Sequence, residues 1–425
     1  MNQRAQAMLK AGDSLRPAVL LSRNLTPDPN PNYRTGMCLA RLGQAPLAEA
    51  FFRKADVPWK RRGQVRQQRL VNLQTSAQLD CLLEVSDRIL AADGGFAAYA
   101  DLDPTAWTCR LAADPRDVVS WHAYRRRFAA DWADPRLGVL LSAPDAVLPG
   151  APLLIAFEEN YGVGNMIFFS RWLAGLRRFH EKITIALPVR LRKLFDSAFA
   201  SAARFVPYED PDGLLAIVQD FEGLKLAAPD LPILAGRYGF APTMAPLFVT
   251  YGVSRRREPR PRIGLGWWTP NPRSSQKRNI GLDEVWRALE PVAEEITFVS
   301  LQPQRDEAIA QIEAAGLRDR IAVPDTDGLS DYLGYVDLIR SCTMVVSIDS
   351  SIPFFAGACG VPTLLLQPLA SPYGWTGGYT RSDSFSSVSY LRQVEPGDWR
   401  IPLARLADEI RARLPATGPA AAIEG

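Results

Sequence analysis

The amino-acid sequence predicts an α/β protein in which two doubly wound units follow a helical region. Apolar strand-like runs and helix-like segments alternate from residue 151 onward, which is the pattern of parallel sheets covered by helices. The clearest example is 344–362, where an apolar run leads into three polar residues and then into a small-residue segment. This order favours a buried strand, a tight turn and a helix that lies close on the sheet.

The bulk composition is that of a globular chain. Its 425 residues are 47% hydrophobic and 22% charged, and this length fits two or three domains of about 100–200 residues each. The net charge of +3 is too small to indicate nucleic acid or an anionic membrane as a partner. No apolar run reaches the roughly 18 residues of a membrane span, so we expect no transmembrane segment and a cytoplasmic location.

Cysteine and histidine usage argues against a metal centre. The five cysteines lie far apart without a C-x-x-C pair, and the only histidines are His122 and His180. We therefore expect no disulfide framework, no structural zinc site and no histidine-built metal centre. His180 is predicted at the end of a helix, away from any ligand.

Residues 1–145 are expected to be helical. In 32–55 apolar residues recur at helical spacing on both sides of Gly43, and this segment resembles one tetratricopeptide repeat, which is a pair of helices. Because about three repeats are needed to bury a continuous core, two interpretations remain open. The region is either a degenerate repeat domain that recognises an acceptor, or a helical cap that packs on the next domain and binds nothing.

The first α/β unit is expected over 151–256, after a proline-rich linker near 140–152. Its pattern predicts strands and helices in alternation, with strands at 153–157, 182–188 and 204–206 and helices at 166–179 and 190–199. Prolines break 224–250 into short apolar pieces, and we predict no element there.

The second α/β unit is expected over 257–402. The predicted strands are 263–267, 297–302, 321–323, 344–348 and 361–367, and the predicted helices are 282–292, 304–315 and 330–340. Residues 403–425 are expected to form a last helix and a disordered tail.

The turn after the 344–348 strand is the strongest candidate for a ligand site. Asp349, Ser350 and Ser351 all favour helix N-caps, and Pro353 fits the first turn of the helix that follows. A helix start at the carboxyl end of a parallel strand is where open α/β sheets bind phosphate groups. The alternative is an ordinary strand–helix unit with a well-capped helix and no ligand.

Four segments of the second unit, taken in order, resemble one family. They are Ile263-Gly-Leu-Gly-Trp with Asn271-Pro-Arg and Lys277-Arg-Asn; Val299-Ser-Leu-Gln; Val345-Val-Ser-Ile-Asp-Ser with Ala356-Gly-Ala-Cys-Gly-Val-Pro; and Ser387-Val-Ser-Tyr-Leu-Arg-Gln-Val-Glu-Pro-Gly-Asp-Trp. The chain is similar to the heptosyltransferase-like glycosyltransferases (family 9), in the bacterial form fused to tetratricopeptide repeats. The resemblance covers about 263–399 and is thinner in the first unit, where it rests mainly on 159–165.

This resemblance implies a fold and an activity. The fold is the GT-B architecture, in which two Rossmann-like domains face each other across a cleft. The activity is the transfer of a sugar from a nucleotide-sugar donor to a protein or glycan acceptor, without a metal ion. The nucleotide sugar would be a co-substrate held by the second domain, and no cofactor is expected.

The resemblance also implies how the donor diphosphate is held. The Ser350 and Ser351 hydroxyls and nearby backbone N–H groups would bind it, while Asp349 would cap and brace the turn or contact the ribose. Gly357 would let the helix approach the sheet closely. Lys277 or Arg278 would supply positive charge to the leaving phosphate, although basic side chains in loops are commonly only solvated.

Two further positions are implied on the donor side. Gln302 would contact the base or ribose, or would merely satisfy neighbouring backbone groups. Tyr373, Gly374 and Trp375 belong to an aromatic, glycine-rich loop that would close over the sugar. The alternative for this loop is packing at the domain interface.

The first unit departs from the family at the catalytic position. The family loop commonly reads Gly-Leu-Gly-Asp, and its aspartate is the usual candidate for the base that takes a proton from the acceptor. Here the loop ends in Asn165, whose neutral amide cannot accept that proton. Glu158 and Glu159 are the nearest carboxylates and could supply a base, or they could be only solvated side chains near a helix start.

Pro353, where relatives often carry histidine, is a second departure. With Asn165 it leaves open a catalytically retired fold that binds nucleotide or acts as a scaffold. A third interpretation is a different nucleotide-sugar enzyme such as an epimerase. The sequence does not identify the sugar, the nucleotide base, the acceptor or the oligomeric state.

Overall fold

The chain is described here from a computed structural model that covers most of the two α/β units and parts of the helical region. The described residues are 29–41, 45–57, 65–66, 69, 72–73, 111, 116–131, 134–199, 202–248, 260–270, 278–326, 328–368, 375, 382, 384–393 and 398–414. Below, the first unit denotes residues 134–248 and the second unit residues 260–414.

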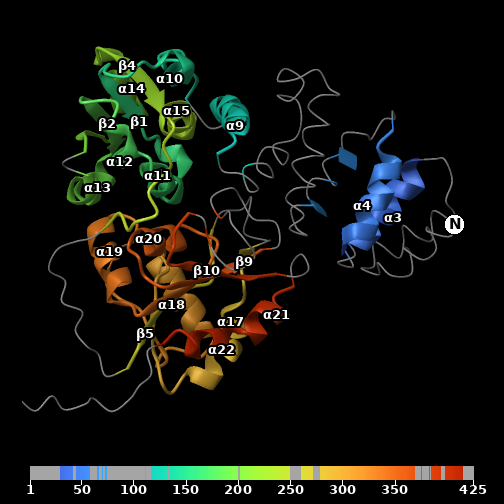
Figure 1. The fold of residues 1–425 in the computed structure, drawn as a ribbon. Coiled ribbons are helices and arrows are strands. Elements are labelled where there is room, and N and C mark those ends of the chain that lie inside the picture. The colour runs from blue at the N-terminus through green and yellow to red at the C-terminus, as the bar shows by residue number, and fades with distance from the viewer. Residues whose placement is uncertain are drawn as a thin grey trace, which may run out of the picture.

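The first unit is a parallel four-stranded sheet with helices around it (Figure 1). The strand order is β3-β2-β1-β4, formed by β1 (Leu153–Ala156), β2 (Ile183–Pro188), β3 (Arg204–Tyr208) and β4 (Leu224–Ala227). The helical elements are α10 (Pro135–Gly138), η1 (Pro144–Ala146), η2 (Glu159–Tyr161), α11 (Val163–Ser170), α12 (Leu173–Leu176), η3 (Val189–Leu191), α13 (Arg192–Phe199), α14 (Pro211–Asp220), η4 (Ala228–Asp230) and α15 (Leu231–Tyr238).

The second unit is a parallel six-stranded sheet of the doubly wound kind. The strand order is β10-β9-β8-β5-β6-β7, formed by β5 (Arg262–Gly266), β6 (Thr297–Ser300), β7 (Ile321–Ala322), β8 (Met344–Ile348), β9 (Thr363–Gln367) and β10 (Val388–Arg392). The helices are α17 (Leu282–Leu289), η5 (Glu290–Val292), α18 (Arg305–Ala314), α19 (Tyr332–Ser341), α20 (Ile352–Ala358), α21 (Arg400–Ala404) and α22 (Leu406–Arg411).

Each sheet has a switch point, which is the place where the chain changes from one side of the sheet to the other. In the second unit it lies between β5 and β8, because strands β5, β6 and β7 run outward in one direction and β8, β9 and β10 in the other. In the first unit it lies between β1 and β4. Open α/β sheets bind their ligands outside the carboxyl ends of the strands at such points.

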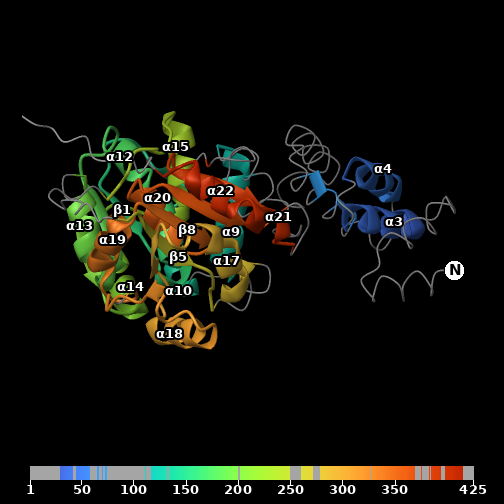
Figure 2. The same ribbon diagram turned by 90° about the horizontal axis from the view of Figure 1, so that it is seen from below.

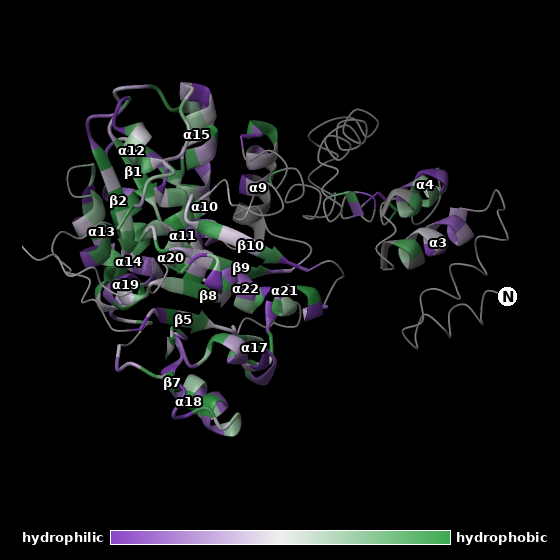
Figure 3. Cartoon of the chain, turned by 60° about the horizontal axis from the view of Figure 1, so that its bottom comes forward, coloured by the Kyte–Doolittle hydropathy of each residue, from purple (hydrophilic) through white to green (hydrophobic). Residues whose placement is uncertain are grey.

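The strands are buried because their sequences are apolar on both faces. Every residue of β1, β8 and β9 is buried, as expected for a parallel strand covered by helices on both sides. Figure 3 shows the strands mostly in the hydrophobic colour, whereas surface helices such as α17 and α18 alternate between the two colours. The amphipathic helices therefore supply the outer layers.

The two units are in direct contact, and one hydrophobic core runs through both. This core includes β1 and α11 from the first unit and α19 and α20 from the second. The Phe168 ring on α11 lies 6.4 Å from the Phe354 ring on α20, measured between ring centroids. Gly164 is essential to this approach: a Cβ atom there would lie 2.9 Å from the Phe354 ring and 3.4 Å from Ser351 Cα.

Two parts of the helical region are described. α3 (Pro29–Arg41) and α4 (Ala45–Ala55) form a helix pair whose close contact depends on Gly36, since a Cβ atom there would lie 2.6 Å from Phe52. This confirms the predicted helix pair, whereas its relation to tetratricopeptide repeats stays a prediction. In both Figure 1 and Figure 2 the pair stands apart from the sheets.

α9 (Val118–Asp131), in contrast, packs on the first unit. The fully buried Trp121 lies against three rings of that unit, and Arg125 forms an ion pair with the fully buried Asp230. This stretch has the arrangement of a helical cap, which is one of the two interpretations given above.

The structure confirms the α/β prediction with two Rossmann-like units. The predicted strands are all present within a few residues of their expected ends, and β4 and α15 fill the stretch for which no element was predicted. α14 was not predicted at all, and neither was β10, which lies in a stretch after residue 367 that was expected to be a loop. Within the described residues, no helix is long and apolar enough to cross a membrane.

Candidate functional site

The β5/β8 switch point brings together several of the residues predicted to bind a donor. Arg278 follows β5, Gln302 follows β6, and Asp349, Ser350 and Ser351 follow β8, so all lie beyond the carboxyl ends of neighbouring strands. Lys277, Tyr373 and Gly374 lie outside the described residues. The site below is therefore built from the remaining positions.

Asp349 is the central buried charge of this site, with a side chain 2% exposed. The Trp375 indole Nε1 donates to Asp349 Oδ1 at 2.8 Å, and Arg278 Nη1 lies 3.2 Å from Oδ2. Arg278 Nη1 also donates to the Asp349 carbonyl oxygen at 3.3 Å. The contact with Oδ2 has ion-pair distance without hydrogen-bond geometry, and among the described residues Oδ2 has no hydrogen-bond donor.

Asp349 was expected to cap the turn before α20, but its carboxylate makes no capping hydrogen bond there. Ser351 is the N-cap of α20, and no side-chain capping bond forms there, while Ser350 Oγ accepts a 3.3 Å hydrogen bond from the Ile352 N–H. The Asp349 carboxylate instead contacts Arg278 and Trp375. Pro353 lies in the first turn of α20, as predicted.

Trp375 does not lie open to a ligand. It is 1% exposed, and its ring centroid is 4.3 Å from that of Phe354, with Phe385 at 6.1 Å. This corrects the expectation that Trp375 covers a sugar: the indole packs against Phe354 and Phe385 of the second unit. Gly357 also serves packing, because a Cβ atom there would lie 2.6 Å from the Phe385 ring.

The Gln302 side chain makes hydrogen bonds to neighbouring backbone groups. Its Oε1 accepts a 3.2 Å hydrogen bond from the Trp267 N–H, and its Nε2 donates to the Trp268 carbonyl oxygen at 3.0 Å. The side chain thereby fixes the segment after β5, which leads toward Arg278. These contacts correspond to the second role considered for Gln302, in which it forms hydrogen bonds with neighbouring backbone groups rather than with a ligand.

The two adjacent acids after β1 have different environments. Glu158 is 3% exposed; its Oε1 accepts from the Tyr161 hydroxyl at 2.9 Å and its Oε2 from the Asp134 N–H at 3.3 Å. Burial raises the pKa of Glu158 above its ordinary value, and the Tyr161 hydrogen bond opposes this. Both Glu158 oxygens are therefore used inside the first unit.

Glu159 is the accessible one of the two. Its side chain is 46% exposed and forms an ion pair with Arg190, which follows β2. The Arg190 guanidinium in turn lies 5.8 Å from the centroid of the Tyr332 ring, at the start of α19 in the second unit. Glu159 thus sits where the two units meet, beyond the carboxyl end of β1.

Asn165 braces the start of α11. Its Nδ2 donates to the Tyr161 carbonyl oxygen at 2.6 Å, a role that an aspartate carboxylate could not take. The amide therefore has a structural use at the position where the family carries its candidate base. Sequence reasoning did not find Arg190 or Asp230. Asp230 lies between Pro229 and Pro232 at the start of α15, and proline in a first helical turn is a common signal of a helix start.

His180 is a satisfied core residue. It is 1% exposed, with Nδ1 2.9 Å from the Ala151 carbonyl oxygen and Nε2 3.1 Å from the Tyr238 hydroxyl. Among the residues that the structure describes, no group of three or more His, Cys, Asp or Glu side chains could hold a metal ion.

No protein-family model matches the chain, and no curated protein does. Among solved structures it is similar to the glycosyl transferase family 9 protein from Veillonella parvula (11% identity, 63% of this chain, 97% of that chain, TM-score 0.43). It is also similar to the E. coli ADP-heptose lps heptosyltransferase II (13%, 61% and 98%, TM-score 0.44). A third similarity is to the Thermobaculum terrenum O-GlcNAc transferase (14%, 96% and 91%, TM-score 0.31).

The assignment of the fold is based on the two parallel sheets of this chain. Two Rossmann-like units whose β1 and β8 strand ends meet through α11 and α20 have the GT-B arrangement.

Proposed function

We propose that this chain is a glycosyltransferase that transfers a sugar from a nucleotide-sugar donor to a protein or glycan acceptor. The observation that carries the proposal is the β5/β8 switch point, which collects a guanidinium, two hydroxyls and a buried carboxylate oxygen that lacks a hydrogen-bond donor among the described residues. This set matches the phosphates and hydroxyls of a nucleotide sugar.

In the proposed complex the donor lies on the second unit. Arg278 would turn from Asp349 toward the diphosphate, with the Ser350 and Ser351 hydroxyls and the backbone N–H groups of that turn completing the contacts. Asp349 Oδ2 would accept a hydrogen bond from a hydroxyl of the nucleotide sugar. That hydroxyl would be the hydrogen-bond donor that this buried oxygen lacks among the described residues. Arg278 provides the charge that stabilises the leaving phosphate, so the proposal includes no metal ion.

Glu159 is the proposed general base. It is accessible, it lies beyond β1 where the two units meet, and its carboxylate is held by Arg190. Transfer requires that this ion pair open, so that Glu159 can take the proton from the acceptor hydroxyl as that oxygen attacks the anomeric carbon. Glu158 would position the loop through Tyr161 rather than touch the acceptor.

Calorimetric titration with a panel of nucleoside diphosphates and nucleotide sugars tests the donor site. We expect one of them to bind, and Arg278→Gln to weaken it by about tenfold or more, since a hydrogen bond to a charged group contributes about 1.5–3 kcal/mol. Arg287→Gln is the matched control, because Arg287 is exposed on α17 and pairs with Asp283. The absence of binding across the panel would overturn the proposal and favour a scaffold.

A further inference from the structure

A cavity of about 540 Å³ lies at the amino ends of β1, β2 and β3, at the end of the sheet opposite Glu159 and Arg190. Its walls come from residues at the starts of these strands, from the end of α14 and from the loop after α12. Its volume is within the range of about 300–1,000 Å³ that is typical of small-molecule sites. None of its lining residues belongs to the proposed donor site, and it is called the amino-end cavity below.

Strand register brings polar lining residues to one face of the sheet. Thr184 on β2 pairs with Arg204 on β3, and the side chains of paired residues in neighbouring parallel strands point to the same face. Lys182 lies two residues before Thr184 and shares that face by alternation. Phe221, at the end of α14, packs on the apolar cluster between α14 and the sheet. The fold therefore places two cations and a hydroxyl in one wall of the cavity.

The amino-end cavity is positively charged. Its charged lining residues are Arg177, Glu181, Lys182 and Arg204. Among the residues that the structure describes, none of these four side chains has a hydrogen-bond or ion-pair partner. Exposed arginines elsewhere in the two units are commonly paired with a carboxylate, as Arg287 is with Asp283 and Arg320 with Glu294. Three cations without such a partner in the described part of the chain therefore set this cavity apart from the rest of the surface.

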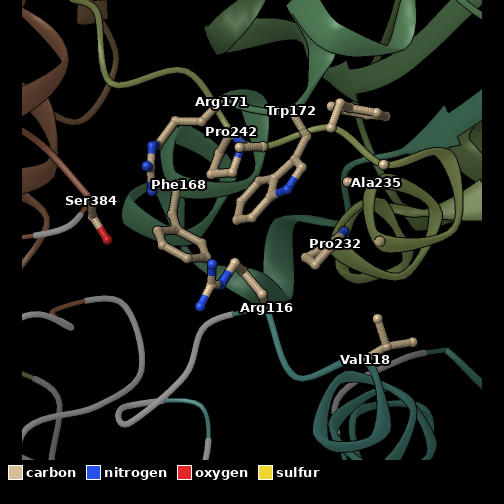
Figure 4. Close-up of a pocket in the computed structure, with 13 residues that line it drawn as sticks. Arg116, Val118, Phe168, Arg171, Trp172, Pro232, Ala235, Pro242 and Ser384 are labelled. Atoms are coloured by element: carbon tan, nitrogen blue, oxygen red, sulfur yellow. The ribbon is translucent and has the colours of Figure 1, made fainter.

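A second cavity, of about 410 Å³, lies beside the contact between the two units and has a different wall (Figure 4). Phe168 and Trp172 line it, and Figure 4 shows both side chains projecting into the space that Pro232 borders. Its Arg171 is 2% exposed; the Nε donates to the Thr243 carbonyl oxygen at 3.1 Å, and the guanidinium lies 5.5 Å from the Phe168 ring centroid. This cation already has its partners, in contrast to those of the amino-end cavity.

The lining of the amino-end cavity defines the chemistry of its ligand. Three positive charges and one negative charge leave a net charge of +2, which a single monovalent group would not balance. Arginine and lysine side chains form their strongest hydrogen bonds with phosphate and carboxylate oxygens. A ligand with several such groups reaches more than one of the cations at once.

We infer that the amino-end cavity binds a small molecule that carries two or more phosphate or carboxylate groups. Arg177, Lys182 and Arg204 bind these groups, and the Thr184 hydroxyl donates to one of them. The inference goes beyond the proposed transfer reaction and does not depend on it, because that reaction is assigned to the carboxyl ends of the strands.

Calorimetric titration of the full chain with matched anions tests this inference. The probes are inorganic tripolyphosphate and citrate, with orthophosphate and acetate as their counterparts that carry one group. We expect at least one of the two polyvalent anions to bind more tightly than its counterpart by about tenfold or more, because each added group forms charge-assisted hydrogen bonds. The polyvalent anion that binds identifies the preferred acidic group. Equal affinity within both pairs, or no binding by either polyvalent anion, would overturn the inference.

Variants of exposed residues locate the binding. Lys182→Gln and Arg204→Gln should each weaken the polyvalent anion by about tenfold or more. Lys193→Gln is the matched control and should change nothing, because Lys193 is exposed on α13 of the same unit and outside the cavity. Glu181→Gln should tighten binding by about two- to fivefold, since it removes the opposing charge from the lining. Equal weakening in Lys182→Gln and Lys193→Gln would reflect only the overall charge of the protein and would contradict the inference.

Arg278→Gln separates the amino-end cavity from the donor site and should leave the polyvalent anions unaffected. Tripolyphosphate binding that is lost in Arg278→Gln and kept in Lys182→Gln would place the anion at the switch point and contradict the inference. Circular dichroism of each variant should match that of the wild type, because Glu181, Lys182 and Arg204 are exposed.

Discussion

The ion pair between Arg125 and Asp230 tests how α9 is held on the first unit. Asp230 is fully buried, its Oδ1 accepts from Arg125 Nε at 2.5 Å, and its Oδ2 accepts from the Ala227 N–H at 3.0 Å. Arg125→Met removes the cation but keeps an apolar side chain of similar length. The change leaves the buried Asp230 carboxylate with the Ala227 N–H as a hydrogen-bond donor but without the Arg125 cation.

The expected loss follows from that unpaired charge. Removing one partner of a buried ion pair costs about 3–5 kcal/mol, whereas replacing both partners is often nearly neutral. We therefore expect Arg125→Met to lower the free energy of unfolding by about 3–5 kcal/mol at pH 8. The double variant Arg125→Met/Asp230→Asn should recover more than half of this loss.

The pH dependence has a definite sign. Burial raises the pKa of Asp230 from its ordinary value of 3.8 to about 6, even with Arg125 opposing the rise. A carboxyl with a raised pKa in the folded state contributes stability below pH 3.8 that is lost as the pH rises through about 6. Without Arg125 the pKa rises further, so protonation relieves more of the penalty, and the deficit of Arg125→Met should be smaller at pH 5 than at pH 8.

Urea unfolding of the wild type, Arg125→Met and the double variant at both pH values measures these differences. Groups such as Glu158 titrate in all three proteins, and their contributions cancel when the variants are compared at one pH. Equal deficits for Arg125→Met at pH 5 and pH 8, or no recovery in the double variant, would refute the argument.

Two further substitutions test the packing around Phe354. Gly164→Ala places a Cβ atom 2.9 Å from the Phe354 ring and should cost about 1–3 kcal/mol in thermal or urea unfolding, whereas Gly138→Ala, with nothing within 4 Å, should not destabilise. Within the second unit, Trp375→Phe keeps a ring against Phe354 but removes the indole donor to Asp349 Oδ1, and should cost about 1–3 kcal/mol. A Gly164→Ala protein as stable as wild type, or a Trp375→Phe protein with unchanged stability, would contradict the packing described.

The strands were predictable because length and flanking residues support their local pattern. β8 and β9 are apolar runs of five residues between polar or glycine-containing turns, which is too short for a typical helix and favours a buried parallel strand. α15 was missed because the prolines of 224–250 were taken as breaks, and α14 was missed because no element was predicted over 211–220. Pro211 and Pro232 lie in the first turns of these helices, and Asp210 caps α14 by accepting from the Gly213 N–H, so the signals of a helix start were present.

The individual site residues were less predictable, because their environments come from distant parts of the chain. Glu158 and Glu159 are adjacent, yet one is buried by Asp134 and Tyr161 and the other pairs with Arg190. No local pattern distinguishes them. Trp375 is buried by Phe354 for the same reason, since that contact joins it to α20, a separate element of the chain.

The most direct test of the central claim is the rate of nucleoside diphosphate release from the nucleotide sugar that binds, compared between Glu159→Gln and Glu158→Gln. If Glu159 is the base, Glu159→Gln lowers this rate by about 10²–10⁴-fold while donor affinity is kept. Glu158→Gln keeps a larger part of the rate and instead lowers the melting temperature, because it disturbs a buried hydrogen-bonded group. A wild-type rate in Glu159→Gln would show that Glu159 is not the base, and no release by the wild-type protein with any donor and acceptor extract would contradict the transferase itself.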